Sequence, residues 1–144
     1  MRWHTQIARI ASIGGDQVKS LLFSFQGRLN RAPYWYVHLA LAAIQFPIFG
    51  ALFALLVYPA MEARDMEAIQ DASRTMNLVG LLFLPMYWIS LAVTVKRCHD
   101  RGRSGWFIFI ALIPFIGVIW LLIELGFLRG TTGPNRFGPD PLGA

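Results

Sequence analysis

Long apolar runs dominate the chain and predict its main elements. Residues 37–58 and 78–95 contain no charged side chain, and residues 106–128 contain one acid, Glu124. A helix needs about 20 such residues to cross roughly 30 Å of hydrocarbon, because each residue rises about 1.5 Å. The pattern therefore predicts an all-α fold, a bundle of three transmembrane helices over these ranges.

The ends of the runs agree with this prediction, although the third run has an alternative. Aromatic residues 34–36 open the first span, and such rings favour the headgroup level of a bilayer. In the third run, Pro114 and Gly117 could instead turn the chain back as a re-entrant hairpin. Each arm would then be about 15 Å long, which is too short to cross. We expect a single crossing here.

The spans divide the chain into an N-terminal arm (residues 1–34), a membrane domain (residues 35–128) and a tail (residues 129–144). In the arm, Asp16 follows two glycines and can cap a short helix that carries Val18 and Leu21 on one side. A basic amphipathic segment of this kind lies in the headgroup plane, so we expect an interfacial helix. Residues 130–141 are rich in Gly, Pro, Asn and Asp, a composition that predicts successive turns.

Composition supports a membrane protein over a soluble one. Of 144 residues, 56% are hydrophobic and 15% are charged, whereas soluble domains average about 45–50% and about 25%. The formal charge of +5 is explained by basic loops that orient spans and meet anionic headgroups, so we expect no nucleic-acid partner. With one cysteine, Cys98, no internal disulfide or cysteine-based metal site can form, and no cofactor or metal is expected. Residues 1–26 lack the apolar core of a signal peptide.

The distribution of charge predicts the orientation of the spans. Basic residues gather in the arm and in the loop between the second and third spans, and these are Arg2, Arg9, Lys19, Arg28, Arg31, Lys96, Arg97, Arg101 and Arg103. The loop between the first two spans is acidic. Basic loops stay in the cytoplasm, which predicts a cytoplasmic N-terminus. Three crossings would then leave the tail on the outer, periplasmic side.

Three sequence blocks resemble a known family. They are Phe25-Gln26-Gly27-Arg28-Leu29-Asn30-Arg31 with Tyr34-Trp35, then Arg97-Cys98-His99-Asp100 with Gly102-Arg103-Ser104-Gly105-Trp106, and finally Gly130-Thr131-Thr132-Gly133-Pro134-Asn135-Arg136-Phe137-Gly138-Pro139-Asp140-Pro141. Together they are similar to the bacterial inner-membrane family catalogued as domain of unknown function 805, over roughly residues 23–141. Cys98 and Pro33 depart from the family pattern, which commonly has Leu and Glu there. The resemblance implies a multi-pass protein of the bacterial inner membrane and no particular mechanism.

The two basic blocks offer the best candidate site. Arginine suits bidentate contact with phosphate, and Asp100 can pair with Arg97 or with an arginine of the first block. One interpretation is a tight charged turn that fixes two spans. The other is a cytoplasmic-face site for an anionic lipid headgroup or a protein partner, formed by Arg28, Arg31, Arg97, His99, Asp100, Arg101 and Arg103.

Other functions have weaker candidates. Cys98, His99 and Asp100 are adjacent, and neighbouring helical residues point about 100° apart, so they cannot form a catalytic relay. We expect no catalytic residues and a membrane scaffold or a lipid- or partner-binding protein. The alternative is one subunit of an oligomeric channel or transporter that uses Gln45 and Glu124, although we expect Glu124 to reach the outer interface near Arg129.

The tail has no assigned role at this stage. Asn135, Arg136 and Asp140 could pair with one another to make a compact cap. If three spans cross, this cap lies on the opposite side of the membrane from the two basic blocks. It could not then contribute to their site.

Overall fold

A computed structural model describes residues 15–143 of the chain. The described part is helical, and its one β-type feature is an isolated bridge between Asn135 and Gly138. The elements are α2 (Gly15–Phe23), α3 (Arg31–Leu52), η1 (Phe53–Val57), α4 (Tyr58–Glu62), α5 (Met66–Leu82), α6 (Leu84–Asp100), η2 (Gly105–Leu112), α7 (Ile116–Leu121) and η3 (Leu122–Phe127). The all-α prediction is confirmed. Residues 1–14 of the N-terminal arm lie outside the described residues.

The first predicted span is a helix and is longer than expected. Helix α3 continues through the π-helical turn η1 into α4, so that 32 residues from Arg31 to Glu62 form one apolar helix able to cross a membrane. At about 1.5 Å per residue this helix is roughly 48 Å long, more than the hydrocarbon layer requires. A short turn follows, and the Asp65 carboxylate starts α5 by accepting the N–H groups of Glu67 (3.1 Å) and Ala68 (3.0 Å).

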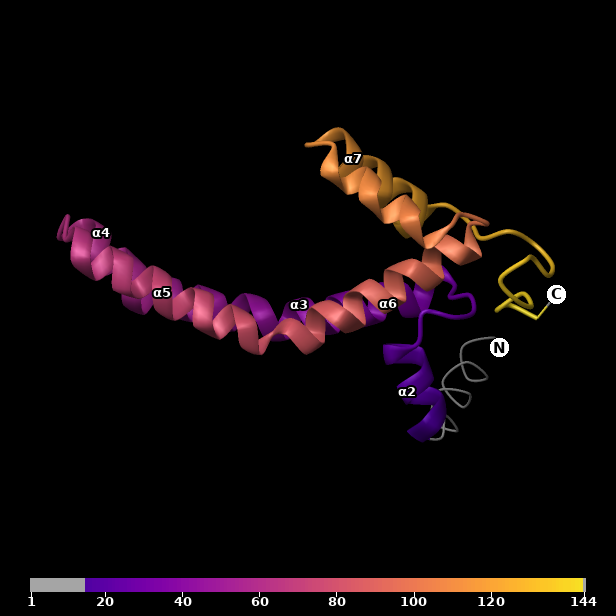
Figure 1. Ribbon diagram of the computed structural model, residues 1–144, viewed down its shortest axis with the longest axis horizontal. Helices are drawn as coiled ribbons and strands as arrows, with labels where there is room; N and C mark the ends of the chain where they lie inside the picture. The colour runs from indigo at the N-terminus through magenta and orange to yellow at the C-terminus, as the bar shows by residue number, and fades with distance from the viewer. Residues whose placement is uncertain (1–14, 144) are drawn as a thin grey trace, which may run out of the picture.

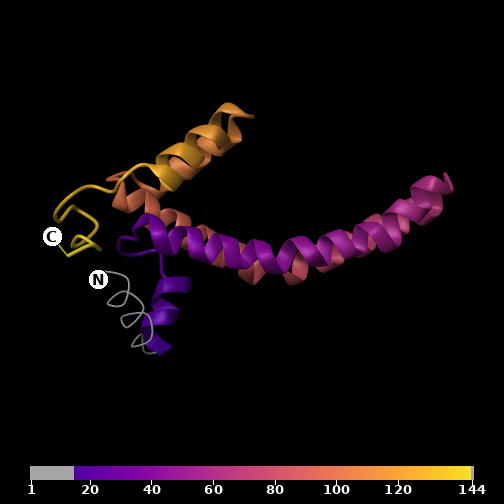
Figure 2. The same cartoon turned by 180° about the vertical axis from the view of Figure 1, so that it is seen from behind.

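The second predicted span is the central part of a bent helix pair. Helices α5 and α6 meet at Phe83 with a bend of 53°, and together they satisfy the length and apolarity of a second crossing. Pro85 lies at the start of α6, where its missing N–H costs nothing. The pair runs back along α3 and α4, and the four helices form one long curved assembly, which we call the helical stem (Figures 1 and 2).

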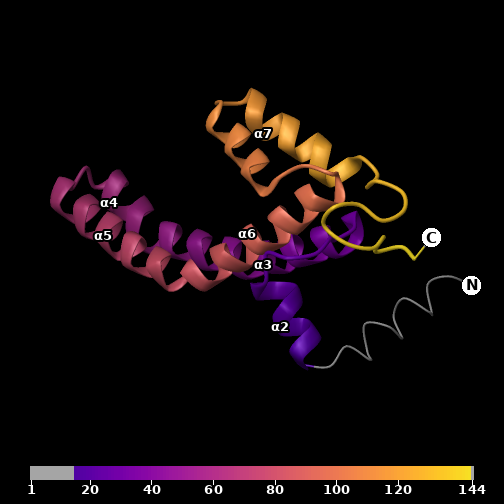
Figure 3. The ribbon, with the colours of Figure 1, turned by 45° about the vertical axis from the view of Figure 1, so that its right-hand side comes forward.

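The predicted third span is not one continuous helix. Residues 105–127 form a hairpin, in which the 3₁₀-helical η2 leads to a turn at residues 113–115 and α7 with η3 returns beside it (Figure 3). At this turn Pro114 has no N–H, and Phe115 adopts a positive φ of 61°. Beyond it, a Cβ at Gly117 would lie 1.8 Å from the carbonyl oxygen of Ile110. The run therefore turns back on itself instead of forming one continuous helix, and each half of the hairpin reaches only about 16–18 Å.

The hairpin returns the tail to the end of the helical stem at which α3 begins and α6 ends. The tail and α2 both lie at this end (Figure 1). Lys96 of α6 donates to the carbonyls of Ser20 (2.8 Å) and Leu21, and these bonds hold the C-terminal end of α2. The expectation that the tail lies opposite the two basic blocks is therefore corrected: all three blocks meet.

Candidate functional site

Asp100 joins the first two sequence blocks. Its carboxylate accepts Nε (3.2 Å) and Nη2 (3.1 Å) of Arg28 and also Nη1 of Arg97. The three side chains are almost fully buried, with exposed fractions of 3%, 1% and 0%. Gly102, with a φ of 70°, ends α6 just beyond Asp100 and allows Arg103 N–H to reach the Cys98 carbonyl at 2.9 Å. The predicted pairing of Asp100 is confirmed, and it involves both expected arginines at once.

The third block closes over this pair. Arg28 also donates to the carbonyls of Thr131 and Gly133, each at 2.6 Å. The N–H of Thr131 donates to the Asp100 carbonyl at 2.8 Å. A Cβ at Gly130 would lie 2.1 Å from Asp100 Oδ2, so only glycine fits against the carboxylate. We call Arg28, Arg97, Asp100 and the tail backbone at residues 130–133 the polar junction.

Side chains at the same end of the helical stem bind the backbone carbonyl groups of the last turn of the hairpin. Four successive carbonyls, at residues 125–128, each accept a side-chain N–H from α3 or α6. Arg97 donates to Leu125 (2.7 Å, Nε) and to Leu128, Trp35 donates to Gly126 (2.9 Å), and Arg31 donates to Phe127 (3.2 Å). The last carbonyls of a helix lack partners within it, and the cationic side chains also suit its negative end. We call these four groups the carbonyl row.

Glu124 lies beside the loop arginines and not at an outer interface. Its Oε1 is 3.1 Å from Nη2 of Arg101 and 3.5 Å from Nε of Arg103, and its side chain is 9% exposed. The expectation that it reaches the outer surface is therefore corrected, because the hairpin returns it to the junction end. Gln45 lines a different cavity of about 350 Å³ between α3 and α6, together with His38 and Ser90. Glu124 is not among the residues that line this cavity.

The tail lies at the polar junction, but the expected pairing among Asn135, Arg136 and Asp140 is not observed. Within residues 15–143, each of the three contacts other groups instead. Asn135 Nδ2 donates to the carbonyl of His99 and to Thr131 Oγ1, both at 3.0 Å. The His99 ring stacks on the Phe137 ring with centroids 4.0 Å apart. The Arg136 guanidinium carbon also lies over the Phe137 ring, 4.7 Å from its centroid. These contacts fix the tail to the end of α6.

Asp140 organises the end of the tail. It accepts the N–H groups of Gly133 (2.9 Å) and Leu142 (2.9 Å). These backbone donors lower the pKa of the Asp140 carboxyl, because they stabilise its charged form.

The Cys98–His99–Asp100 sequence forms no catalytic relay. Cys98 is fully buried, and His99 Nδ1 donates to the Gly27 carbonyl at 3.2 Å. Asp100 is held by its two arginines. Among residues 15–143, no hydrogen bond joins the side chains of these three neighbours. His99 and Asp100 each fix α6 to another part of the chain instead.

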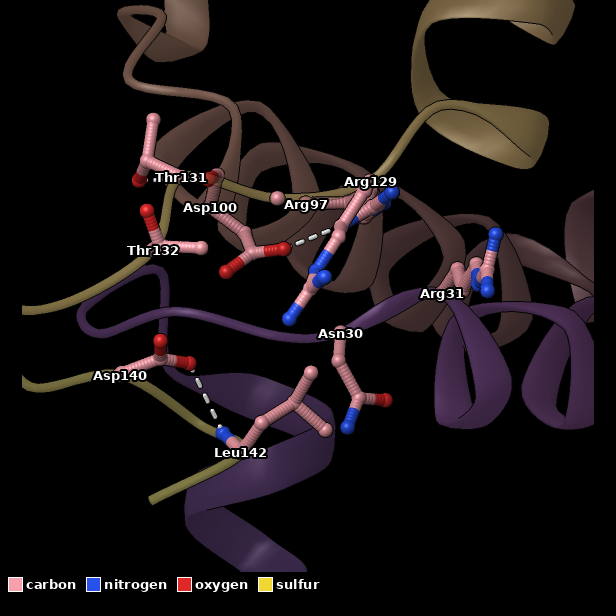
Figure 4. A pocket seen from close by; sticks show the side chains of 10 residues that line it. Asn30, Arg31, Arg97, Asp100, Arg129, Thr131, Thr132, Asp140 and Leu142 are labelled. Carbon is pink, nitrogen blue, oxygen red and sulfur yellow. Dashed lines mark hydrogen bonds and ion pairs between the residues drawn. The ribbon is translucent and has the colours of Figure 1, made fainter. Parts of the chain in front are cut away.

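A polar cavity of about 180 Å³ opens beside the polar junction (Figure 4). Its lining residues come from the start of α3, the end of α6 and the tail, and they are Asn30, Arg31, Arg97, Asp100, Arg129, Gly130, Thr131, Thr132, Asp140 and Leu142. Sequence reasoning placed Arg31, Arg97, Asp100 and Asp140 among the candidates but missed Arg129 and the two threonines. The signal available for them was the third sequence block, which begins one residue after Arg129.

Comparison with known proteins covers most of the chain. Residues 22–139 match the family described as protein of unknown function DUF805. In Escherichia coli K12, the inner membrane protein YhaH is 38% identical over 81% of this chain and 86% of its own length, and the inner membrane protein YhaI is 32% identical over 81% and 85%. The uncharacterized protein YiiR is 31% identical over 85% and 89%. No solved structure matches the chain.

Proposed function

The chain belongs to the DUF805 family of bacterial inner-membrane proteins, and from this premise we propose that it is a non-catalytic membrane scaffold whose basic end binds the anionic headgroups of the cytoplasmic leaflet. The observation that carries the proposal is that some arginines at this end are buried and paired, whereas others are exposed. Arg28 and Arg97 are buried in the polar junction, whereas Arg31, Arg103 and Arg129 are exposed at the same end. Basic side chains near an anionic surface each contribute about 1 kcal/mol to binding.

The position of this end relative to the bilayer is supported by its aromatic residues. Residues 34–36 follow Arg31 within about one and a half turns of α3, where their rings suit the headgroup level. The opposite end of the helical stem carries four acids, which are Glu62, Asp65, Glu67 and Asp71. Under the positive-inside rule, the polar junction faces the cytoplasm and the acidic end faces outward.

This orientation gives a topology of two crossings and one re-entrant hairpin. The helix Arg31–Glu62 and the bent pair Met66–Asp100 cross, and residues 105–127 enter and leave the bilayer from the cytoplasmic side. A turn at membrane depth is tolerated when its polar groups are paired, and the N–H groups of Ile116 and Gly117 donate back into the turn at 2.6 and 3.0 Å. Both the tail and the start of α3 are then cytoplasmic.

A reporter fused after Ala144 checks the topology. We expect a fluorescent protein at this position to fluoresce and alkaline phosphatase to be inactive, because the hairpin returns the tail to the cytoplasm. A phosphatase inserted after Arg64, in the turn between α4 and α5, serves as the matched control and should be active. An active phosphatase at the C-terminus would restore the three-crossing topology.

The lipid environment of the whole protein tests the function itself. In nanodiscs of mixed phosphatidylglycerol and phosphatidylcholine, we expect native mass spectrometry to find the anionic lipid enriched around the protein. Raising the ionic strength should reduce this enrichment, since exposed charges are screened within about 10 Å at 0.1 M salt. Equal retention of both lipids at low salt would contradict the proposal.

A further inference from the structure

The cavity beside the polar junction contains carboxylates that are already neutralised. Both oxygens of Asp100 accept guanidinium groups, from Arg28 and Arg97. Both oxygens of Asp140 accept backbone N–H groups. Neither acid therefore has a strong demand for a further cation.

The hydrogen-bonding groups that remain open are almost all donors. The Arg129 guanidinium makes no hydrogen bond or ion pair within residues 15–143, and Arg31 uses one nitrogen on the Phe127 carbonyl. An arginine side chain carries five N–H donors, so most of them stay available. The Asn30 side chain does not cap α3, which leaves the first N–H groups of that helix open beside the cavity. Positive charge, helix polarity and free N–H groups all favour an anion here.

One hydrogen-bond acceptor without a partner indicates a second group that the ligand carries. The Oδ1 atom of Asn30 is buried without a hydrogen-bond partner, although buried polar atoms almost always have one. A ligand that carries a hydroxyl next to its anionic group would satisfy this oxygen once the Asn30 side chain turns toward the cavity that it lines. The anion and the hydroxyl would then belong to the same molecule.

The size and depth of the cavity suit such a group. Its volume of about 180 Å³ corresponds to roughly six water molecules at about 30 Å³ each, which is enough for a phosphate and a neighbouring hydroxyl. Arg31 lies within about one and a half turns of the aromatic residues 34–36, so the cavity opens at headgroup level. Arginine pairs readily with phosphate oxygens through charge-assisted, bidentate bonds.

We infer that this cavity binds one phosphate group, held between Arg31 and Arg129 with its neighbouring hydroxyl on Asn30. The inference rests on the proposed function in placing the cavity at an anionic leaflet. Two sources carry this chemistry: the headgroup of an anionic lipid such as phosphatidylglycerol, and free phosphate in its protonated form. All three guanidinium nitrogens of Arg28 and of Arg97 already donate within the protein, and these two residues act by fixing the walls of the cavity.

Two substitutions with the same change of charge test the cavity. Arg129→Gln removes a cavity donor, whereas Arg136→Gln removes an exposed arginine of the same tail outside the cavity. The full-length protein is placed in phosphatidylglycerol nanodiscs, and the tightly retained lipid is counted by native mass spectrometry. We expect one retained lipid, bound about tenfold or more weakly by the Arg129 variant and unchanged by the Arg136 variant, since a hydrogen bond to a charged group contributes about that factor. Thr132→Val, a second cavity variant, should weaken binding without any change of charge.

A second arm identifies the source of the phosphate. In detergent without anionic lipid, inorganic phosphate binding is followed by ³¹P line broadening for both arginine variants. Broadening that is lost only in the Arg129 variant assigns the cavity to free phosphate, even if the anionic-lipid enrichment expected of the whole protein is absent. Equal lipid losses in the two arginine variants would overturn the cavity and leave the proposed function standing. Binding of neither lipid nor inorganic phosphate would also overturn it.

Discussion

Replacing Arg97 with methionine is expected to lower the free energy of unfolding by about 3–5 kcal/mol, the range found when one partner of a buried ion pair is removed. Methionine fills much of the same volume but leaves Asp100 with Arg28 alone. It also leaves the carbonyls of Leu125 and Leu128 without their donors. The measurement is equilibrium unfolding in mild detergent, followed by tryptophan fluorescence.

An exposed arginine provides the control for this substitution. Arg74 pairs with Asp71 at 3.1 Å on the surface of α5, with side chains 75% and 65% exposed. Arg74→Met should therefore cost only about 0–1 kcal/mol. Similar losses for Arg97→Met and Arg74→Met would show that the polar junction does not stabilise the fold.

The second large effect is expected at Gly117, where the two arms of the hairpin touch. A Cβ there would lie 1.8 Å from the Ile110 carbonyl oxygen and 2.7 Å from its carbon, and both are backbone atoms that cannot rotate away. Gly117→Ala must separate the arms, and we expect a loss of roughly 1–3 kcal/mol in the same unfolding experiment. Limited proteolysis should also cut the tail faster, because the hairpin positions it.

Gly50 is the matched control for Gly117. It lies inside α3, and a Cβ at this position would meet no atom within 4 Å. Gly50→Ala should leave stability unchanged or raise it by up to about 1 kcal/mol, since alanine is the better helix former. If both glycine variants behave alike, the close approach of the two hairpin arms is not a feature of the folded protein.

The sequence predicted the parts of the fold that depend on composition and local pairing. Uncharged runs located the apolar helix Arg31–Glu62 and part of the bent pair Met66–Asp100. The lone acid of the second loop, Asp100, indicated Arg97 and an arginine of the first block as its partners. The hairpin was harder to predict, because apolar composition is the same for a helix that crosses and for one that turns back. Pro114 and Gly117 allowed both outcomes, and the contact between Gly117 and Ile110 that decides between them becomes visible only in three dimensions.

The wrong prediction for residues 106–128 also explains the wrong prediction for the tail and the failure to predict the cavity. With three crossings, the tail would face the opposite compartment, so Arg129 and Thr132 could not be grouped with Arg31. Glu124 was assigned to an outer interface for the same reason. The prediction for a single turn therefore determined three expectations, for the tail, for the cavity and for Glu124.

The carbonyl row has a consequence for how this region of the chain can vary. Side chains of α3 and α6 recognise the backbone of residues 125–128, and backbone groups are the same whatever side chains the hairpin carries. Exchanging one apolar residue for another along the exposed side of the hairpin leaves this recognition intact. Adding or deleting a single residue rotates every later carbonyl by about 100° around the helix, away from its donor. Divergence of the hairpin is therefore constrained in length far more than in composition.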